Sequence, residues 1–490
     1  MTDSADCDTE CSVAPPEFVT SPPTATAWRK LDRTVRNRHH GTANVFVLEN
    51  ADSVVLLQRT TMAQVQPFRA IRYARPEVTH FIAPPYDVLT QADKDDLLRK
   101  EEHNIVAIDL PHMPPKSAGP DAVYDRAAGD LTSWLDIHTL ARDETPAIYA
   151  YHQTYELGGE TLTRKKFFAR LRLEPFGTGH VFPHEQTFGG PKEDRLKLTT
   201  ATRCNLSPIF GLYPDEQNEI AALIDGAIKP DSDQQGMLGG VHNKLWAITD
   251  ATVIAAIKGK MADKPIFIAD GHHRYGTALN FRQKQIDECG EPAADDPINF
   301  VLAVLGGMED PGATIQPYFR TIANLPNVTP GDLHAALSQE FEWKATEKPT
   351  DADELARLLA GTGPQAIAFY FGRGQACATI VPKREDLLRD YEANRKPAWR
   401  KLPYAILHRY ILDEVVGPRF NNGMPPTVHY LKSMEEAMRD AEACNGIAVL
   451  MPATTMTQLR DICTAGELMP QKSTYFYPKL ATGMVINPLY

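Results

Sequence analysis

The chain has 490 residues, of which 43% are hydrophobic and 23% charged, values typical of globular proteins with two or three domains. Its 63 Asp and Glu outnumber its 51 Lys and Arg, and the net charge of −12 disfavours non-specific binding to nucleic acid. No apolar stretch approaches the roughly 18 residues that a membrane span requires. The acidic N-terminus lacks the features of a secretory signal.

The seven cysteines are scattered along the chain, and none forms a CxxC pair. Such spacing is typical of a reduced protein and not of a disulfide framework. Cys7 and Cys11 lie in a polar tail, where metal binding has little support. We therefore expect a cytoplasmic protein without structural disulfides.

Residues 1–61 differ in composition from the rest of the chain. Up to about Pro23 they are rich in Ser, Thr, Pro and acidic residues, a composition that buries too little apolar surface to become ordered. The apolar run 44–57 is compatible with a strand, but the sequence shows no partner for it. We interpret 1–61 as a disordered or non-native tail; either Met62 is a start of translation, or the tail is native and flexible.

From residue 62 to 325 the pattern alternates between strands and helices. Two aromatic and β-branched runs flank Gly158 and Gly159, which predicts a β-hairpin. The apolar run that ends at Pro84 and Pro85 predicts a central strand stopped by the two prolines. Further patterns predict helices at 91–101, 122–140 and 275–288, short strands at 244–250 and 264–270, and a buried strand at 298–308.

A Pro-rich stretch leads into residues 326–490, where helix and strand patterns alternate again. We expect helical segments within 333–343 and 403–417, and strands at 365–372, 376–382 and 446–453. The aromatic triplet 475–477 is expected in the core or in a strand between two domains. The whole pattern predicts a mixed α/β (α+β) fold in two portions, 62–325 and 326–490, that pack together.

The densest group of ionisable residues follows an apolar run in the segment FIADGHHRYGTAL, 267–279. The run ends at Asp270, Gly271 permits a sharp turn close to a ligand, and a helix begins directly afterwards. Free N–H groups at a helix N-terminus favour anions, helped by the helix dipole. Asp270 is a candidate Mg²⁺ ligand, or a group that orients a hydroxyl; alternatively, it only caps the helix.

Three further side chains in this segment fit the same chemistry. Arg274 offers a bidentate donor for phosphate, and His272 and His273 offer imidazoles that titrate near neutral pH. Alternatively, the histidines pack in the core or face solvent. The strand–turn–helix pattern predicts a site for a nucleotide or another phosphorylated ligand.

A second group of ionisable residues lies in the segment HVFPHEQTFGGPKEDRLKL. Glu185 is a candidate general base, and Lys192 or Arg195 is suited to neutralise phosphate charge. His184 and Asp194 belong to the same predicted site. An ordinary helix start would also explain the pattern KEDRLKL.

Other motifs give weaker signals. In APPYDV the two prolines fix a turn that presents Tyr86 and Asp87, either to a ligand or as plain turn residues. The segment KST at 472–474 lacks the glycines of a phosphate-binding P-loop. A transition-metal site formed by His184, His272 and His273 with Glu185 or Asp270 is an alternative, although its spacing matches no known ligand signature.

Several segments in this order resemble one family. On these motifs the chain is identified as a member of the bacterial and archaeal domain-of-unknown-function family 1015. The resemblance extends from about Val65 to the C-terminus and carries no settled function. Its segments are QPFRAIRY, APPYDV, PHEQT with EDRLKL, CNLSPIFGLY, LWAITD, IADGHHRYGTAL and MPQKSTYFYPK.

The segment ADGHHR also resembles, more distantly, the nucleotide-binding signature of the ParB/sulfiredoxin-like fold. Because His272 stands where sulfiredoxins have a cysteine, thiol-based reduction is not implied. The free-serine kinases of this fold have the most similar motif. That resemblance implies a nucleotide-binding core, with Glu185 as the base and with Asp270, His272 and Arg274 in the phosphoryl-transfer loop.

One position departs from the family pattern. Relatives tend to read PTHR where this chain reads QPYFR, so Phe319 stands in place of a histidine. If that histidine serves chemistry in relatives, the activity of this chain differs; if it only packs, nothing changes.

From these observations we expect a kinase that acts on a small hydroxyl compound, with serine as the nearest analogue. We expect ATP or ADP and Mg²⁺ as cofactors, Glu185, Asp270 and His272 in catalysis, and no nucleic-acid or membrane partner. The alternatives are a nucleotide-binding regulatory protein without turnover and a metal-dependent hydrolase. The residues expected to bind the nucleotide are His184, Asp194, Arg195, Gly271, His273 and Arg274.

Overall fold

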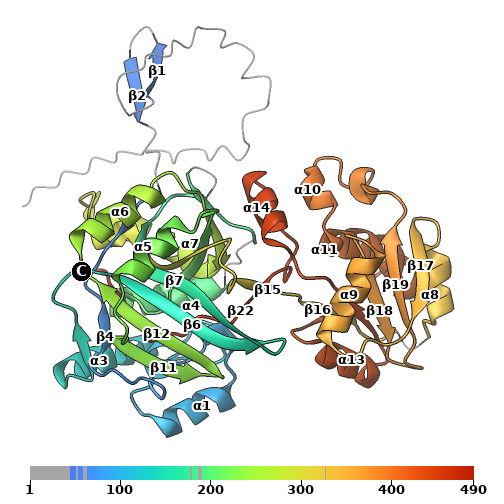
Figure 1. The fold of residues 1–490 in the computed structure, drawn as a ribbon, viewed down its shortest axis with the longest axis horizontal. Helices are drawn as coiled ribbons and strands as arrows, with labels where there is room; N and C mark the ends of the chain where they lie inside the picture. The colour runs from blue at the N-terminus through green and yellow to red at the C-terminus, as the bar shows by residue number, and fades with distance from the viewer. Residues whose placement is uncertain (1–44, 51–52, 59–62, 177–178, 186–189, 326) are drawn as a thin grey trace, which may run out of the picture. The chain divides into compact units, whose positions relative to one another are not determined.

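A computed structural model of the protein describes residues 45–50, 53–58, 63–176, 179–185, 190–325 and 327–490 (Figure 1). The chain divides into two compact units, Met1–Thr60 and Thr61–Tyr490. In the first unit, strand β1 (Val45–Asn50) pairs antiparallel with β2 (Ser53–Gln58). The apolar run therefore does have a partner, namely its own second half, which corrects the expectation from the sequence. The remainder of the predicted tail lies outside the described residues.

A nine-stranded mixed sheet forms the centre of the N-terminal portion of the second unit. Its order is β11-β12-β6-β7-β14-β10-β13-β8, with β3 beside β7. The pairs β10/β14 and β13/β8 are parallel, and the others are antiparallel. The strands are β3 (Val65–Gln66), β6 (Ile148–Leu157), β7 (Glu160–Arg172), β8 (Val181–Phe182), β10 (Ile209–Tyr213), β11 (Gln234–Leu238), β12 (Val241–Ile248), β13 (Ile266–Asp270) and β14 (Phe300–Gly307).

Helices cover both faces of this sheet because its strands alternate their side chains between two apolar cores. On β6, for example, Ile148 joins the core under α5, α6 and α7, whereas Tyr149 joins the core that includes α3 and α4 (Figure 1). The helices are α3 (Asp121–Asp136), α4 (Gly190–Thr202), α5 (Glu219–Ala227), α6 (Ala251–Met261) and α7 (His272–Cys289). Shorter elements complete this portion: β4 (Ile71–Tyr73), α1 (Gln91–Lys100), α2 (Val106–Asp109), β5 (Leu140–Arg142) and β9 (Cys204–Asn205).

A second, six-stranded sheet of order β17-β19-β18-β21-β16-β20 forms the C-terminal portion. Helices α9 and α13 pack on one face, and α8 and the π-helix Ile406–Val416 pack on the other. The strands are β16 (Phe319–Ile322), β17 (Phe341–Thr346), β18 (Ile367–Phe371), β19 (Cys377–Pro382), β20 (Val428–Leu431) and β21 (Ile447–Leu450). The helices are α8 (Pro330–Leu337), α9 (Ala352–Thr362), α10 (Pro397–Arg400), α11 (Pro403–Ala405), α12 (Gly417–Phe420), α13 (Met434–Ala443) and α14 (Met456–Thr464).

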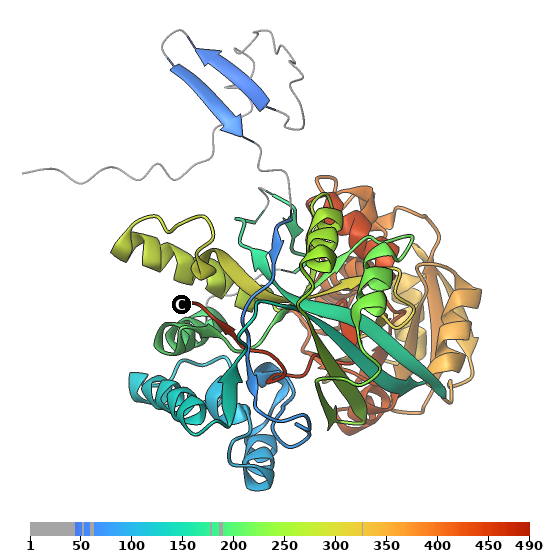
Figure 2. The ribbon, with the colours of Figure 1, turned by 60° about the vertical axis from the view of Figure 1, so that its left-hand side comes forward.

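The last residues of the chain return to the N-terminal portion. Strand β22 (Tyr475–Tyr477) pairs with β15 (Thr314–Gln316), and β23 (Asn487–Pro488) pairs with β9. Figure 2 shows this red C-terminal segment running among blue and green elements of the second unit. Both ends of the second unit therefore build the N-terminal portion.

The structure confirms the mixed α/β fold and the predicted hairpin. Strands β6 and β7 are joined by Gly158 and Gly159, whose positive φ angles of 59° and 79° suit a two-residue turn. The predicted strand before Pro84 is wrong. There the chain forms turns, with the N–H groups of Phe81 and Ile82 donating to the carbonyl of Val78, so the apolar side chains are buried without a sheet.

Two further expectations concern Phe319 and membrane-spanning helices. Phe319 begins β16 and is buried against α9 and α13, where it packs in an apolar core. Within the described segments, none of the helices has the length and the apolar character needed to cross a membrane.

Buried histidines make the stability of the fold depend on pH. Burial lowers the pKa of His152 to about 4, and it lowers the pKa of His408 to about 4 as well. In the unfolded chain a histidine binds a proton near pH 6.5. Between these values the unfolded state binds more protons, so the free energy of unfolding falls as the pH decreases.

We expect each of these two histidines to cost about 1–2 kcal/mol of stability between pH 7 and pH 5. Urea unfolding at both pH values measures the loss. The variant His408→Gln should show a smaller loss than the wild type, whereas His80→Gln, at an exposed position, should not. An unchanged pH dependence in His408→Gln would count against this explanation.

Candidate functional site

The turn between β13 and α7 is the centre of the candidate site. Strand β13 ends at Asp270 and α7 begins at His272, with Gly271 between them at φ 88°. A Cβ atom on Gly271 would lie 3.0 Å from Nε of Arg274 and 3.1 Å from Cα of Ile209. Only glycine combines this left-handed backbone with such close packing. The turn thus has the strand–turn–helix form predicted from the sequence.

Asp270 is paired with two cations at this turn. Its Oδ2 lies 2.6 Å from Nζ of Lys479, and its Oδ1 lies 3.1 Å from Nη2 of Arg274. Burial alone would raise the pKa of Asp270, but Lys479 and Arg274 hold it well below its usual value. Burial opposes the charge on Lys479, but the Asp270 carboxylate raises the pKa of this lysine. Arg274 also donates to the carbonyl of Pro208, which fixes its guanidinium behind the turn.

His184 and His272 form a buried, neutral pair, with ring centroids 4.6 Å apart. Nδ1 of His184 lies 2.6 Å from the carbonyl oxygen of Ile268, which can only accept, so Nδ1 carries the proton. Nε2 then accepts from the Thr474 hydroxyl at 2.9 Å. The backbone N–H of His184 donates to Nε2 of His272 at 3.2 Å. Burial lowers the pKa of both rings, which keeps them neutral.

Glu185 and His273 lie at the more open side of the turn. The Glu185 side chain is 30% exposed, and its Oε1 lies 3.9 Å from Nε2 of His184. Burial lowers the pKa of His273, and the positive charges of Lys116 and Lys192 lower it further. The negative charge of Glu185 acts to raise the pKa of His273. A carboxylate and several cationic groups therefore surround the first turn of α7.

Three lysines from residues 432–479 lie over two tyrosine rings close to Asp270; we call Lys432, Lys472 and Lys479 the lysine cluster. Nζ of Lys432 and Nζ of Lys479 lie 5.6 and 5.2 Å from the ring centre of Tyr475, and Nζ of Lys472 lies 5.5 Å from that of Tyr318. Burial lowers the pKa of Lys432, and the charges of the other two lysines lower it further. Mutual repulsion of this kind is relieved by a bound anion.

Asp194 and Arg195 lie in α4, where the two residues are 2% and 5% exposed. Arg195 bonds to Asp194 at 2.8 Å and to the Asp109 carbonyl at 2.6 Å, and its Nη1 lies 3.4 Å from the Asp109 carboxylate. Tyr124 donates to Asp194, and Ser207 donates to Asp109, at 2.8 and 2.7 Å. All of these contacts place the guanidinium in a buried network that holds α4 against α2 and α3.

The segment APPYDV lies next to this network. The Tyr86 ring is buried under the Arg195 guanidinium, 4.0 Å from its centroid. Asp87 lies 3.7 Å from Nζ of Lys116, and its charge also acts on His273. The structure thus brings the segment APPYDV, α4 and the start of α7 together.

Sequence reasoning assigned no binding role to Thr474 or to the three residues of the lysine cluster. Lys472, Thr474 and Lys479 lie in the quoted segment MPQKSTYFYPK, which lacks the P-loop glycines and whose aromatic triplet indicates a core strand. Lys432 follows β20 without any motif. Asp270 and Lys479 are 209 residues apart in the sequence, so their contact leaves no local sequence pattern.

The alternative metal site of three histidines is not assembled here. Both ring nitrogens of His184 have partners, and Nε2 of His272 accepts a hydrogen bond. Among the described residues, the one group of three His, Cys, Asp or Glu side chains close enough to share a metal ion lies elsewhere, at His429, Asp440 and Cys444.

These features define the chain as a mixed α/β protein with a charged site at a strand–turn–helix junction. The chain belongs to the family described as protein of unknown function (DUF1015), whose model matches residues 65–405. The match includes the turn at Gly271 but ends before the lysine cluster. No curated protein matches the chain.

Solved structures show only weak similarity. A conserved hypothetical protein from Pyrococcus furiosus is 16% identical, with a TM-score of 0.28, over 61% of this chain and 89% of its own. A free serine kinase in complex with AMP is 15% identical, with a TM-score of 0.28, over 61% and 83%. SbnI from Staphylococcus aureus is 11% identical, with a TM-score of 0.32, over 66% and 87%. At these scores the similarities define no function.

Proposed function

We propose that this protein is a cytosolic, nucleotide-dependent phosphotransferase acting on a small hydroxyl compound. The observation that carries the proposal is that Lys479, one member of the lysine cluster, lies at the turn before α7. A helix N-terminus attracts anions through its N–H groups and its dipole. Here Lys479 is held at that turn by Asp270, at 2.6 Å, and a polyphosphate would neutralise the repulsion among the lysines.

Phosphoryl transfer needs neutralised phosphate charge, aligned reactants and a base at the acceptor hydroxyl. In the proposed reaction, the first turn of α7 and the lysine cluster bind the phosphates. Glu185 takes the proton of the hydroxyl, whose oxygen attacks the terminal phosphorus. The bond from that phosphorus to the bridging oxygen breaks, and the nucleotide leaves with one phosphate fewer.

The buried groups at the turn act by positioning. Asp270 orients Lys479, and Arg274 holds the turn from behind through its bonds to Asp270 and to the Pro208 carbonyl. The neutral His184 and His272 fix the backbone that carries Glu185, since the His184 N–H donates to His272. We place His273 at the phosphates, near Lys116 and Lys192. We assign Asp194 and Arg195 to supporting α4.

Mg²⁺ accompanies most nucleotides, and the sequence suggests Asp270 as its ligand. Both of its carboxylate oxygens are paired with cations, so direct coordination would require one ion pair to open. The residues present therefore do not fit a resident Mg²⁺ at Asp270. An ion brought in on the nucleotide phosphates suits this site better.

Calorimetric titration with ATP and ADP, each with Mg²⁺, tests the nucleotide site. We expect saturable binding of at least one nucleotide, and an affinity about 10- to 100-fold lower in Lys479→Met, because a charged hydrogen bond is lost. Lys284→Met is the matched control, since Lys284 is 42% exposed near the far end of α7. Absence of binding, or equal affinity in both variants, would contradict the proposal.

A further inference from the structure

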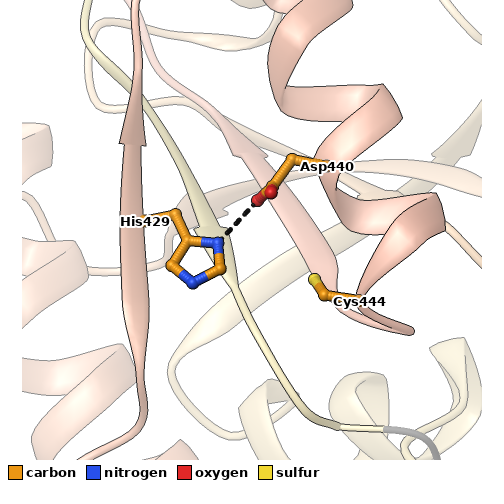
Figure 3. Close-up of side chains that lie close together, drawn as sticks. All are labelled: His429, Asp440 and Cys444. Carbon is orange, nitrogen blue, oxygen red and sulfur yellow. Dashed lines mark hydrogen bonds and ion pairs between the residues drawn. The ribbon is translucent and has the colours of Figure 1, made fainter. Parts of the chain in front are cut away.

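Three side chains of different chemistry converge at the edge of the six-stranded sheet. His429 lies on the edge strand β20, Asp440 on α13, and Cys444 just after the end of that helix. Nδ1 of His429 lies 2.8 Å from Oδ2 of Asp440. One imidazole nitrogen, one carboxylate oxygen and the thiol sulfur all lie within 4.8 Å of one another. Figure 3 shows the three side chains pointing into the same space.

The backbone fixes this arrangement. Asp440 and Cys444 are four residues apart, which places them on one face of a helix, and the Cys444 N–H donates to the Asp440 carbonyl at 2.9 Å. His429 is held opposite them because β20 pairs with β16, where His429 is in register with Thr321. The His429 and Asp440 side chains are 43% and 29% exposed, so an ion from solvent can reach them.

Cys444 is half-buried, and its sulfur lies beside the Asp440 carboxylate. Backbone N–H groups of Asn324 and Gly446 donate to this sulfur. Amide donors at a sulfur are typical of metal-bound thiolates, whose charge they help to support. A bound cation would remove the unfavourable contact between the carboxylate and the thiolate.

We propose that His429, Asp440 and Cys444 bind a divalent transition-metal ion of the zinc class. Nitrogen, sulfur and carboxylate ligands together are the set that Zn²⁺ prefers. A neutral imidazole, one carboxylate and one thiolate balance its charge of +2. The exposed side of the site leaves one position for water. Binding replaces the hydrogen bond between His429 and Asp440 and releases the thiol proton to solvent. The ion would join the end of α13 to the edge strand.

Cobalt(II) and zinc titrations of the full chain, stripped of metal by a chelator, test this site. We expect one equivalent of Co²⁺ to give a sulfur-to-cobalt charge-transfer band in the near ultraviolet, and Zn²⁺ to displace it. Cys444→Ser should abolish the band, and His429→Gln should weaken Zn²⁺ binding at least about tenfold. Thermal unfolding should shift to higher temperature with Zn²⁺ in the wild type and not in Cys444→Ser.

Other cysteines provide the controls. Cys289 is an exposed free thiol, and Cys7 and Cys11 lie outside the described residues. Cys289→Ser and the double variant Cys7→Ser/Cys11→Ser should keep the band and the affinity. A band that persists in Cys444→Ser, or a wild type that gives no band and binds no Zn²⁺, would overturn the proposal. Neither result depends on nucleotide binding or on phosphoryl transfer.

Discussion

Replacing Glu185 with glutamine is expected to slow phosphoryl transfer about 10²- to 10⁴-fold at saturating nucleotide. Glutamine keeps the shape and the polarity of the side chain but cannot accept the proton of the acceptor hydroxyl. The buried His184 beside it should remain in place, because its hydrogen bonds to Ile268 and Thr474 do not involve Glu185. Initial rates of product formation at several nucleotide concentrations separate the effect on kcat from binding.

Nucleotide affinity should change little in Glu185→Gln. Glu193→Gln is the matched control, since Glu193 is exposed in the first turn of α4, and its rate should equal that of the wild type. Full activity in Glu185→Gln would exclude this carboxylate as the base. A parallel loss in Glu193→Gln would point to a general effect of charge.

Replacing Arg195 with methionine should lower the free energy of unfolding by about 3–5 kcal/mol. The variant leaves the carboxylates of Asp109 and Asp194 buried, at 3% and 2% exposure, without their cation. Burial already raises the pKa of Asp109, so its charge becomes still less favourable. Urea unfolding at pH 7 measures the difference.

A double variant separates loss of the cation from loss of packing. Arg195→Met/Asp109→Asn should be more stable than Arg195→Met, because one unpaired charge is removed. Arg384→Met should cost less than about 1 kcal/mol, since the Arg384 side chain is 47% exposed and its ion pairs face water. A loss below about 1 kcal/mol in Arg195→Met would show that the network is not needed for folding.

Local sequence patterns were sufficient for those parts of the fold that depend on local backbone geometry. Gly158 and Gly159 predict the hairpin because a two-residue turn of type I′ needs positive φ at both positions. Asp270 and Gly271 predict the strand–turn–helix site for a similar reason. The run before Pro84 misled the prediction, because its burial comes from turns packed against other segments and not from a sheet.

Contacts between distant segments could not be predicted in this way. The pairing of Asp270 with Lys479 depends on the return of the C-terminal segment to the N-terminal portion, which the isolated bridge between Ile71 and Ile486 also reflects. Similarly, the pattern KEDRLKL suggests a charged surface helix. Its Arg195 is buried because Asp109, 86 residues earlier, supplies a partner.

Transfer of a phosphoryl group is the most direct test of the proposed function. The purified chain is incubated with ATP or ADP, Mg²⁺ and a panel of hydroxyl compounds that includes serine, other amino acids and sugars, and is followed by ³¹P NMR. We expect a new phosphomonoester signal that requires the acceptor and matches the loss of nucleotide. Saturable nucleotide binding without any product across the panel would contradict a phosphotransferase and would favour a nucleotide-binding regulatory protein.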